Sequence, residues 1–340
     1  MKYNLLGKTG VLVSELSLGT MTFGGKGYWK AIGELPQDDI NDILKTALDS
    51  GINFIDTANG YSEGLAETML GKGLKDLGIS RQLVVIATKV RIRMGAGANQ
   101  VGLSKLHIAD SVDDSLKRLG MSHIDLLYIH GVDPITPLEE TMRGLEDVVR
   151  DGKVRYLGIS NHPAWMVTKA NGIADKMGWS KFVALQNYYT IASRDIEREI
   201  VPMALSEGLS IMPWSPLAGG FLSGKYTREH PVAGHSRRDN FDFPPINKPK
   251  AYDLIDAMKL IASAHKVSVA QVALAYLLKK PGVTSIIIGA KKSAQLVDNI
   301  AASQLALTSE EMNQLDNISA LTTEYPAWMV ERQSTGRFPE

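Results

Sequence analysis

Four side chains in the first half of the chain could together move a proton. Asp56 ends the short apolar run Phe54-Ile55, and Tyr61 follows five positions later. Lys89 and His130 each end a later apolar run. A phenol has a pKa of about 10, and a nearby ammonium favours its ionisation. We therefore expect Tyr61 to protonate an oxygen that becomes an alkoxide, with Lys89 lowering the phenol's pKa. Asp56 would hold the lysine, and His130 would orient the same oxygen.

The composition excludes several other kinds of chemistry. The chain has no cysteine, which rules out disulfides, thiolate metal sites and cysteine nucleophiles. The 37 Lys and Arg residues balance the 37 Asp and Glu residues, so the basic surplus of a nucleic-acid-binding protein is missing. The remaining histidines form no ligand cluster, and no metal site is expected: His107, His123, His162, His230, His235 and His265.

The sequence shows no signal for secretion or for membrane insertion. The N-terminus has no apolar core or cleavage signal of a secretory leader, and no stretch approaches the length of a membrane span. We expect a cytoplasmic protein without a membrane partner. Its oligomeric state is left open by the sequence.

The candidate residues stand at the ends of apolar runs, and these runs alternate with helical patterns. Strands are expected at residues 16–18, 54–55, 83–88, 124–129, 154–159, 182–185, 209–213 and 284–288. Helices are expected at about 37–50, 63–77, 104–119, 138–150, from 163, 196–206, 252–265, 268–279 and from a cap at Ser293. Eight strands alternating with helices predict a (β/α)₈ TIM barrel, with an N-terminal β-hairpin near residues 3–13.

The whole chain, residues 1–340, is expected to be one domain. Thr308 to Glu311 fits a capping box for an extra C-terminal helix, and the tail at 320–340 is expected to be irregular. A doubly wound open sheet is the alternative fold. Its dinucleotide-binding form has G-x-G-x-x-G after the first strand, which neither Gly24-Gly25-Lys26-Gly27 nor Gly95-Ala96-Gly97 matches.

Barrel enzymes carry their active sites at the C-terminal ends of the strands. We therefore expect Asp56, Lys89 and His130 to meet the residues that end the later strands: Ser160, Asn161, Gln186, Trp214, Ser215 and Gly289. The run from Gly219 to Lys225 matches G-x-x-x-x-G-K, but Tyr226 replaces the Ser or Thr that binds Mg²⁺ in a P-loop. This argues against a nucleotide triphosphatase, while a glycine-rich loop after the seventh strand still suits phosphate binding.

In these motifs the sequence resembles the aldo-keto reductase family, in the branch with bacterial reductases and potassium-channel β subunits. The resemblance runs from Leu6-Gly7-Lys8-Thr9-Gly10 to about Ala301, and Asp56, Tyr61, Lys89 and His130 match the catalytic tetrad of the family. It implies that the cofactor is bound by Gly19, Thr20, Met21, Ser160, Asn161, Gln186, Trp214, Ser215, Pro216, Leu217, Gly219, Leu222, Gly224, Lys225, Arg237, Gly289, Lys291, Gln295, Asp298 and Asn299. Two positions depart from the family pattern, where Asp298 replaces a usual glutamate and Lys291 an arginine or serine.

The resemblance implies NADPH-dependent reduction of a small carbonyl compound, with Tyr61 as proton donor and NADH a less favoured cofactor. The loop after the first strand, with Met21, Phe23, Tyr28 and Trp29, offers an apolar wall, and Phe23 and Trp29 are the expected substrate contacts. Two other functions remain open: a cofactor-binding sensor or regulatory subunit with little turnover, and a lyase that uses Lys89 as a Schiff base. The natural substrate and the direction of reaction are not indicated.

Overall fold

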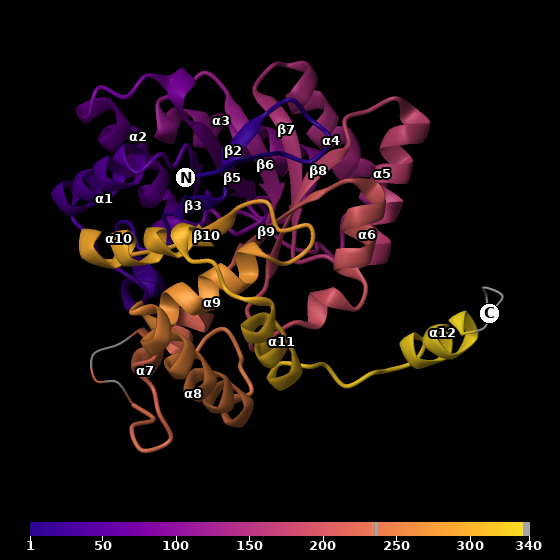
Figure 1. The fold of residues 1–340 in the computed structure, drawn as a ribbon. Helices are drawn as coiled ribbons and strands as arrows, with labels where there is room; N and C mark the ends of the chain where they lie inside the picture. The colour runs from indigo at the N-terminus through magenta and orange to yellow at the C-terminus, as the bar shows by residue number, and fades with distance from the viewer. Residues whose placement is uncertain (233, 235–236, 336–340) are drawn as a thin grey trace.

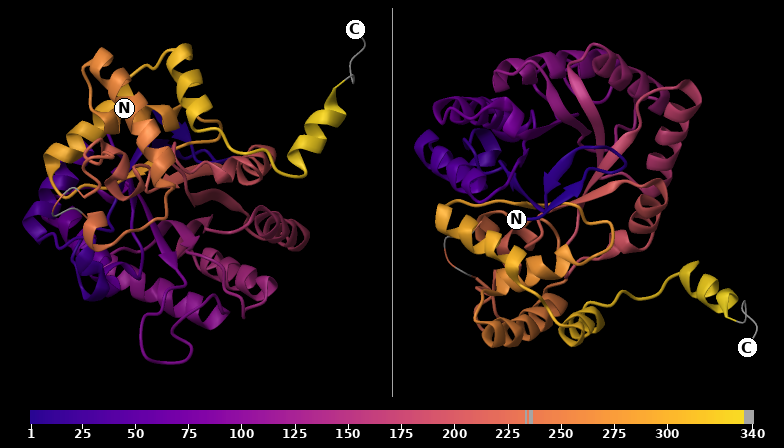
Figure 2. Two further views of the ribbon diagram at one scale, coloured as in Figure 1. Left: turned by 90° about the horizontal axis from the view of Figure 1, so that it is seen from below. Right: turned by 45° about the horizontal axis from the view of Figure 1, so that its top comes forward.

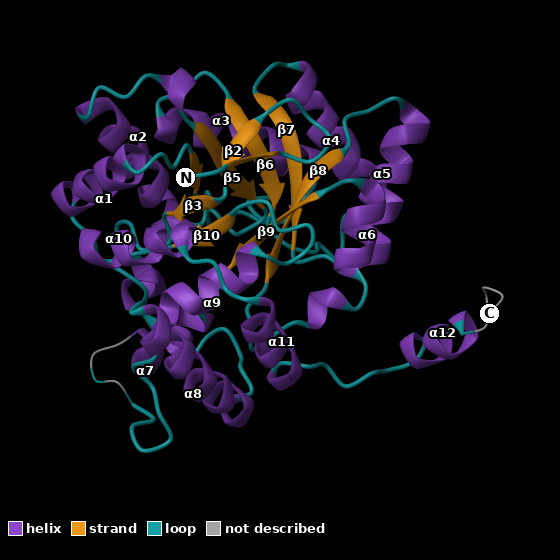
Figure 3. Cartoon of the chain, in the orientation of Figure 1, coloured by secondary structure: helices purple, strands orange, loops and turns teal. Residues whose placement is uncertain are grey.

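The computed structural model describes residues 1–232, 234 and 237–335, so His235 and the last five tail residues lie outside the described part. Eight parallel strands form a barrel in the order β10-β3-β4-β5-β6-β7-β8-β9 (Figures 1 and 3). Their bounds are β3 (Leu16–Gly19), β4 (Phe54–Asp56), β5 (Val85–Val90), β6 (Ile124–Ile129), β7 (Val154–Ser160), β8 (Phe182–Tyr188), β9 (Ser210–Trp214) and β10 (Ile286–Ile288). Ile211 closes the barrel, because its N–H donates to Gly282 O and its carbonyl accepts from Thr284 N, both at 2.9 Å. The predicted TIM barrel is confirmed.

Helices surround the barrel (Figure 2). They are α1 (Gln37–Asp49), α2 (Leu65–Asp76), α3 (Lys105–Leu119), α4 (Leu138–Arg150), α5 (Ala164–Met177), α6 (Ile200–Glu207), α9 (Val269–Leu278) and α10 (Ser293–Ala301). The predicted bounds of α3 are confirmed: Ser104 Oγ accepts from His107 N at 3.2 Å, and Gly120 ends the helix at φ 65°. The predicted cap at Ser293 is wrong, because Lys292 is the N-cap of α10 and its side chain makes no capping bond.

The N-terminal hairpin closes the end of the barrel at which the strands begin. It consists of β1 (Tyr3–Leu5) and β2 (Leu12–Ser14), which are antiparallel (Figure 2). Leu6 and Val13 are fully buried against the side chains inside the barrel, among them Phe54, Leu126, Tyr128 and Met212. Gly7 N donates to Oγ of Ser210, the first residue of β9, at 2.6 Å. Because this end is filled, the site must open at the other end.

Several elements lie outside the eightfold pattern: α7 (Arg237–Asn240), α8 (Lys248–His265), α11 (Ser309–Ile318), α12 (Ala327–Ser334), and the 3₁₀ turns η1 (Gly27–Ala31), η2 (Tyr61–Gly64), η3 (Arg81–Leu83), η4 (Asp195–Glu197), η5 (Ala218–Ser223) and η6 (Ala302–Gln304). The capping box of Thr308 and Glu311 is present at the start of α11. The expectation of an irregular tail is wrong for α12. This helix lies away from the barrel and buries no residue (Figure 1), so it lacks the packing that gives a helix its apolar period.

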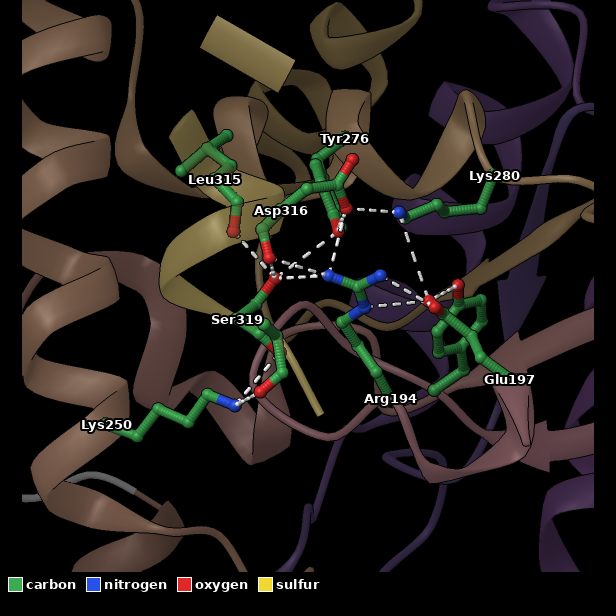
Figure 4. Close-up of polar contacts among 10 residues, drawn as sticks. Arg194, Glu197, Lys250, Tyr276, Lys280, Leu315, Asp316 and Ser319 are labelled. Carbon is green, nitrogen blue, oxygen red and sulfur yellow. Dashed lines mark hydrogen bonds and ion pairs between the residues drawn. The ribbon is translucent and has the colours of Figure 1, made fainter. Parts of the chain in front are cut away.

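A polar network joins α11 to the barrel (Figure 4). We call it the Arg194 network; it comprises Tyr189, Arg194, Glu197, Lys250, Tyr276, Lys280, Asp316 and Ser319. Arg194 lies at its centre, with Nη1 2.9 Å from Asp316 Oδ1 and Nη2 2.7 Å from Glu197 Oε2. Lys280 Nζ is 2.5 Å from the same Asp316 oxygen. Asp316 therefore balances two largely buried cations.

No single helix in the described ranges is both long and apolar enough to cross a membrane. The pair α8 and α9 meets that test only when taken together, and the two helices meet at an angle of 97°.

Candidate active site

A cavity of about 470 Å³ opens at the C-terminal ends of the strands. It brings together most of the side chains that the sequence predicts for the site: Gly19, Met21, Trp29, Asp56, Tyr61, His130, Ser160, Asn161, Gln186, Trp214, Ser215, Pro216, Leu217, Gly219, Arg237, Gly289, Lys291, Gln295 and Asn299. These residues come from strands and loops along nearly the whole chain, so the barrel alone gathers them.

Lys89 is the centre of the polar cluster at the base of this cavity. Its side chain, on β5, is fully buried, and Nζ lies 2.6 Å from Asp56 Oδ2 on the neighbouring β4. Nζ also donates to Thr57 O at 2.8 Å and to Tyr61 OH at 3.2 Å. An ammonium has three donors, so each has an acceptor here. Gln186 Nε2 donates to the other Asp56 oxygen at 2.7 Å, which fixes the carboxylate.

Burial dominates the ionisation of Tyr61. It raises the pKa of the phenol above its ordinary value, and the attraction of Lys89 opposes this shift without reversing it. The predicted effect of Lys89, a lowering of the pKa of Tyr61, is present, but the sequence did not indicate the larger effect of burial, which makes the net shift upward. Burial lowers the pKa of Lys89, but Asp56 and Tyr61 outweigh it and the net shift is upward. At neutral pH the pair is a protonated phenol beside an ammonium.

His130 adds a neutral imidazole. Burial, together with the positive charges of Lys89 and Arg91, holds the pKa of His130 well below its usual range. Its ring meets the Tyr61 ring edge to face, with centroids 5.8 Å apart. His130 Nδ1 is buried and has no hydrogen-bond partner among the described residues. A neutral imidazole beside the phenol can hydrogen-bond an oxygen without adding charge.

Asn161 and Trp214 form a second polar group beside the tetrad. Asn161 has φ 57°, and its Nδ2 donates to His130 O at 3.1 Å and to Ser160 Oγ at 2.9 Å. Its Oδ1 accepts from Trp214 Nε1 at 3.0 Å. A left-handed non-glycine residue is strained, and such strain concentrates at functional sites. The Trp214 ring lies near those of Tyr188 and Phe243, with centroids 5.0 Å and 6.0 Å away.

Cations line the part of the cavity beside β10 and α7. Burial lowers the pKa of Lys291, and the nearby Arg237 lowers it further, so the two positive charges lie close together. Burial also lowers the pKa of Arg237, and its buried Nε has no partner among the described residues. The backbone comes close at Gly219, which has φ 65° and where a Cβ would lie 2.8 Å from Phe243 O. Two neighbouring cations beside a glycine, whose backbone carries no side chain, suit a phosphorylated ligand.

Phe23 is not a cavity residue. Its side chain is fully buried in the core, and its carbonyl accepts from Ser62 Oγ at 2.8 Å. The prediction that Phe23 contacts the substrate is corrected accordingly: its backbone N–H donates to Thr20 O at 2.9 Å and its ring packs in the core, while Trp29 lines the cavity.

Five residues predicted to bind the cofactor also lie outside the lining. Asp298 accepts hydrogen bonds from Ser268 Oγ at 2.8 Å and Gln271 Nε2 at 2.6 Å, so its carboxylate is engaged with α9. Leu222 is fully buried in the core. Cofactor contacts remain predictions for the five: Thr20, Leu222, Gly224, Lys225 and Asp298.

Sequence reasoning missed other lining residues, notably Arg91, Ile92, Phe241 and Phe243. Arg91 directly follows Val90, the last residue of β5, so its place just after the end of a barrel strand was a signal for it. The two phenylalanines lie in a long loop without periodicity, which offers no such signal.

Comparison with known proteins agrees with this geometry. The sequence profile of the Aldo/keto reductase family matches residues 15–320. The chain belongs to the aldo/keto reductase family. Versiconal hemiacetal acetate reductase of Aspergillus parasiticus is 36% identical, covering 93% of this chain and 96% of that protein. The uncharacterized oxidoreductase YrpG of Bacillus subtilis is 36% identical over 94% and 96% of the two chains. A probable voltage-gated potassium channel subunit beta of Oryza sativa subsp. japonica is 35% identical, with the same coverages of 94% and 96%.

These relatives make the chain an NAD(P)H-dependent oxidoreductase of the carbonyl-reducing kind. Within the described ranges, no group of three or more His, Cys, Asp or Glu side chains could hold a metal ion.

Proposed function

We propose that this aldo/keto reductase uses NADPH to reduce aldehydes or ketones to alcohols, with Tyr61 as the proton donor. The observation that carries the proposal is the placement of Lys89, whose ammonium contacts Asp56 Oδ2, Thr57 O and Tyr61 OH at the base of the cavity. When bound, the nicotinamide cofactor supplies a hydride to the carbonyl carbon.

Side chains of the site supply the proton that this reaction requires and stabilise the phenolate that its loss leaves. Negative charge grows on the carbonyl oxygen as it becomes an alkoxide, and the Tyr61 O–H donates its proton there. The phenolate that remains is stabilised by Lys89 Nζ, 3.2 Å away. Neutral His130 hydrogen-bonds the same oxygen and fixes its direction. Asp56 and Gln186 keep the lysine in place throughout.

The cavity lining supports a phosphorylated nicotinamide cofactor. Trp214 offers a ring for stacking, and Asn161 and Gln186 offer amides for a carboxamide. Lys291 and Arg237 supply positive charge for phosphate groups, and two close cations stabilise an anion more than either alone. We propose NADPH over NADH because its additional phosphate matches this second charge.

The variant Tyr61→Phe tests the assignment of the proton donor. It should lower kcat on small aldehydes by about 10²- to 10⁴-fold, the usual share of general acid catalysis. NADPH affinity, measured by fluorescence quenching, should stay near that of the wild type. Tyr28→Phe is the matched control: it removes a second phenol that lines the cavity but has no lysine partner in the described structure. Equal losses in both variants would contradict the role of Tyr61.

The alternative function is a cofactor-binding regulatory subunit, favoured by the likeness to a plant potassium-channel β subunit. An enzyme should turn over small aldehydes at about 1 s⁻¹ or faster. A regulatory subunit should bind NADPH and reduce every carbonyl far more slowly. Single-turnover and steady-state rates on one aldehyde, followed by NADPH absorbance, separate slow chemistry from slow cofactor release.

A further inference from the structure

The cavity is positively charged although the chain as a whole is neutral. The charged side chains that line it are Asp56, Arg91, Arg237 and Lys291. Asp56 is already paired with the buried Lys89. The other three charged residues in the described lining are all cations, in a chain with 37 basic and 37 acidic residues.

Two of these cations belong to the side that suits phosphate. The positive charge of Arg237 lowers the pKa of Lys291, and it also opposes the rise in the pKa of Tyr28 and Tyr61. Arg91 lies on another side of the cavity. Its charge lowers the pKa of His130 and of His162, and its Nε donates to Val132 O at 3.2 Å. The phosphates of a bound cofactor thus give no account of Arg91.

The Arg91 guanidinium makes one hydrogen bond, through Nε, and its other donors have no partner among the described residues. The backbone has φ 140° at Arg91, an unfavourable conformation for a side chain with a Cβ, and the bond from Nε to Val132 O fixes the start of the guanidinium. Neither Nη group makes a hydrogen bond or ion pair with any residue that the structure describes. A planar guanidinium presents its donors in a fork that matches the two oxygens of a carboxylate.

Arg91 lines the same cavity as Tyr61, and its segment packs beside the turn that carries Tyr61. Ile92, the next residue, also lines the cavity, and a Cβ on Gly60 would lie 2.8 Å from Ile92 Cδ1. Gly60 directly precedes Tyr61, so the segment that carries Arg91 packs against the turn that carries the proton donor. Trp29, whose ring meets Tyr61 at 5.1 Å between centroids, supplies an aromatic wall in the same cavity.

We infer that Arg91 binds a carboxylate on the carbonyl substrate, so that the preferred substrates are aldehydes or ketones that also carry a carboxylate. This inference rests on the proposed carbonyl reduction and names the class of substrate for the same site. The apolar and aromatic lining favours a hydrocarbon or aryl group between the two functional groups. Arg91 is then a specificity-determining residue, and the tetrad carries out the chemistry.

The test compares 4-formylbenzoate with its methyl ester, since the two have the same aldehyde and ring and differ in one charge. In the wild type, kcat/KM for the acid should exceed that for the ester. In Arg91→Met the acid-to-ester ratio should fall by about 10- to 100-fold, because a charge-assisted bidentate contact is lost. Arg91→Lys, which keeps the charge and loses the fork, should give an intermediate ratio.

Arg93→Met is the matched control. Arg93 is exposed, its Nη1 donates to Gly95 O and Gly97 O, and it does not line the cavity. This variant removes the same charge two residues away and should leave the acid-to-ester ratio unchanged. Raising the salt concentration should lower the wild-type ratio, which supports a charged contact without any mutation.

An acid-to-ester ratio that is the same in Arg91→Met and the wild type overturns the inference. If the wild type reduces neither compound, the proposed function fails, and the inference is then decided by binding. Titration of 4-(hydroxymethyl)benzoate into the NADP⁺ complex should give a Kd that rises about 10- to 100-fold in Arg91→Met and not in Arg93→Met. A Kd that does not depend on Arg91 rejects the carboxylate site.

Discussion

The variant Asp56→Asn isolates the electrostatic contribution of the buried carboxylate. Asparagine keeps the shape of Asp56 and an oxygen that can accept from Lys89, but it removes the charge. Lys89 is fully buried, with Nζ 2.6 Å from the carboxylate, so its ammonium would be left in the barrel without a counter-charge. Leaving such a charge unpaired is strongly destabilising.

The size of the loss is limited by deprotonation of the lysine. An ordinary lysine has a pKa of about 10.4, so releasing its proton at pH 7 costs about 4.6 kcal/mol at 1.36 kcal/mol per pKa unit. The variant should therefore lose about 3–5 kcal/mol of unfolding free energy. For 340 residues, at about 2.1 cal/mol/K of unfolding entropy each, this lowers Tm by about 4–7 °C.

The pH dependence identifies the cause. In the wild type the pKa of Lys89 is raised, so the lysine is protonated in both states from pH 7 to 9 and its stabilising effect is lost only above that range. In Asp56→Asn the folded lysine is neutral and the unfolded lysine is protonated, so unfolding takes up a proton and stability rises with pH. The difference from wild type should shrink by about 1.4 kcal/mol per pH unit, leaving about 0–2 kcal/mol at pH 9.

The assay is urea unfolding followed by circular dichroism at pH 7, 8 and 9. The double variant Asp56→Asn/Lys89→Met removes both charges and should recover most of the stability, because an apolar replacement leaves no buried charge. A stability difference that does not change with pH would refute the reasoning. So would a double variant no more stable than Asp56→Asn.

Three further predictions address cofactor binding, the attachment of α11 to the barrel, and the pH dependence of the rate. Lys291→Ala should weaken NADPH about 10- to 150-fold and barely change NADH, whereas Lys292→Ala should do much less; fluorescence titration with both cofactors checks this. Asp316→Asn should lower the unfolding free energy by about 1–2 kcal/mol, since Asp316 is part exposed but balances two largely buried cations. Asp256→Asn, in the exposed 4.0 Å pair with Lys259, should change it little in the same unfolding experiment. On a neutral aldehyde, kcat/KM should not change as the pH is lowered through 6.5, because the lowered pKa keeps His130 neutral there. A pH–rate profile tests this.

The order of the barrel could be read from the sequence because local and global signals agree. The strands are mainly apolar runs bounded by glycine or polar residues, and helices such as α3 end at a glycine in the left-handed conformation, here Gly120. Where a segment lacks packing the signal fails. The eight residues of α12 bury no side chain, so no apolar period marks the helix, and a tail without structure was expected.

Side-chain direction in the loops is what the sequence could not supply. Asp56 ends β4 and Gln186 lies in the last three residues of β8, and the barrel brings these strand ends together whatever the loops do. Phe23 lies in a loop, where no periodic pattern indicates whether its ring faces the cavity or the core. Asp298 lies on a helix, but its bonds to Ser268 and Gln271 depend on how α10 meets α9. The pKa of Tyr61 likewise depends on burial, a property of the assembled barrel.

Lys89 and Arg91 show how one strand can separate chemistry from specificity. Lys89 lies on β5, and Arg91 is the first residue after the end of that strand. Lys89 is completely buried and has an acceptor for each of its donors, so any change there disturbs the proton transfer itself. Arg91 follows the end of the strand at Val90, lines the cavity, and keeps its Nη donors free of described partners. A substitution at Arg91 can therefore alter which carbonyl compound is held while the hydrogen bonds among Asp56, Tyr61 and Lys89 stay as they are.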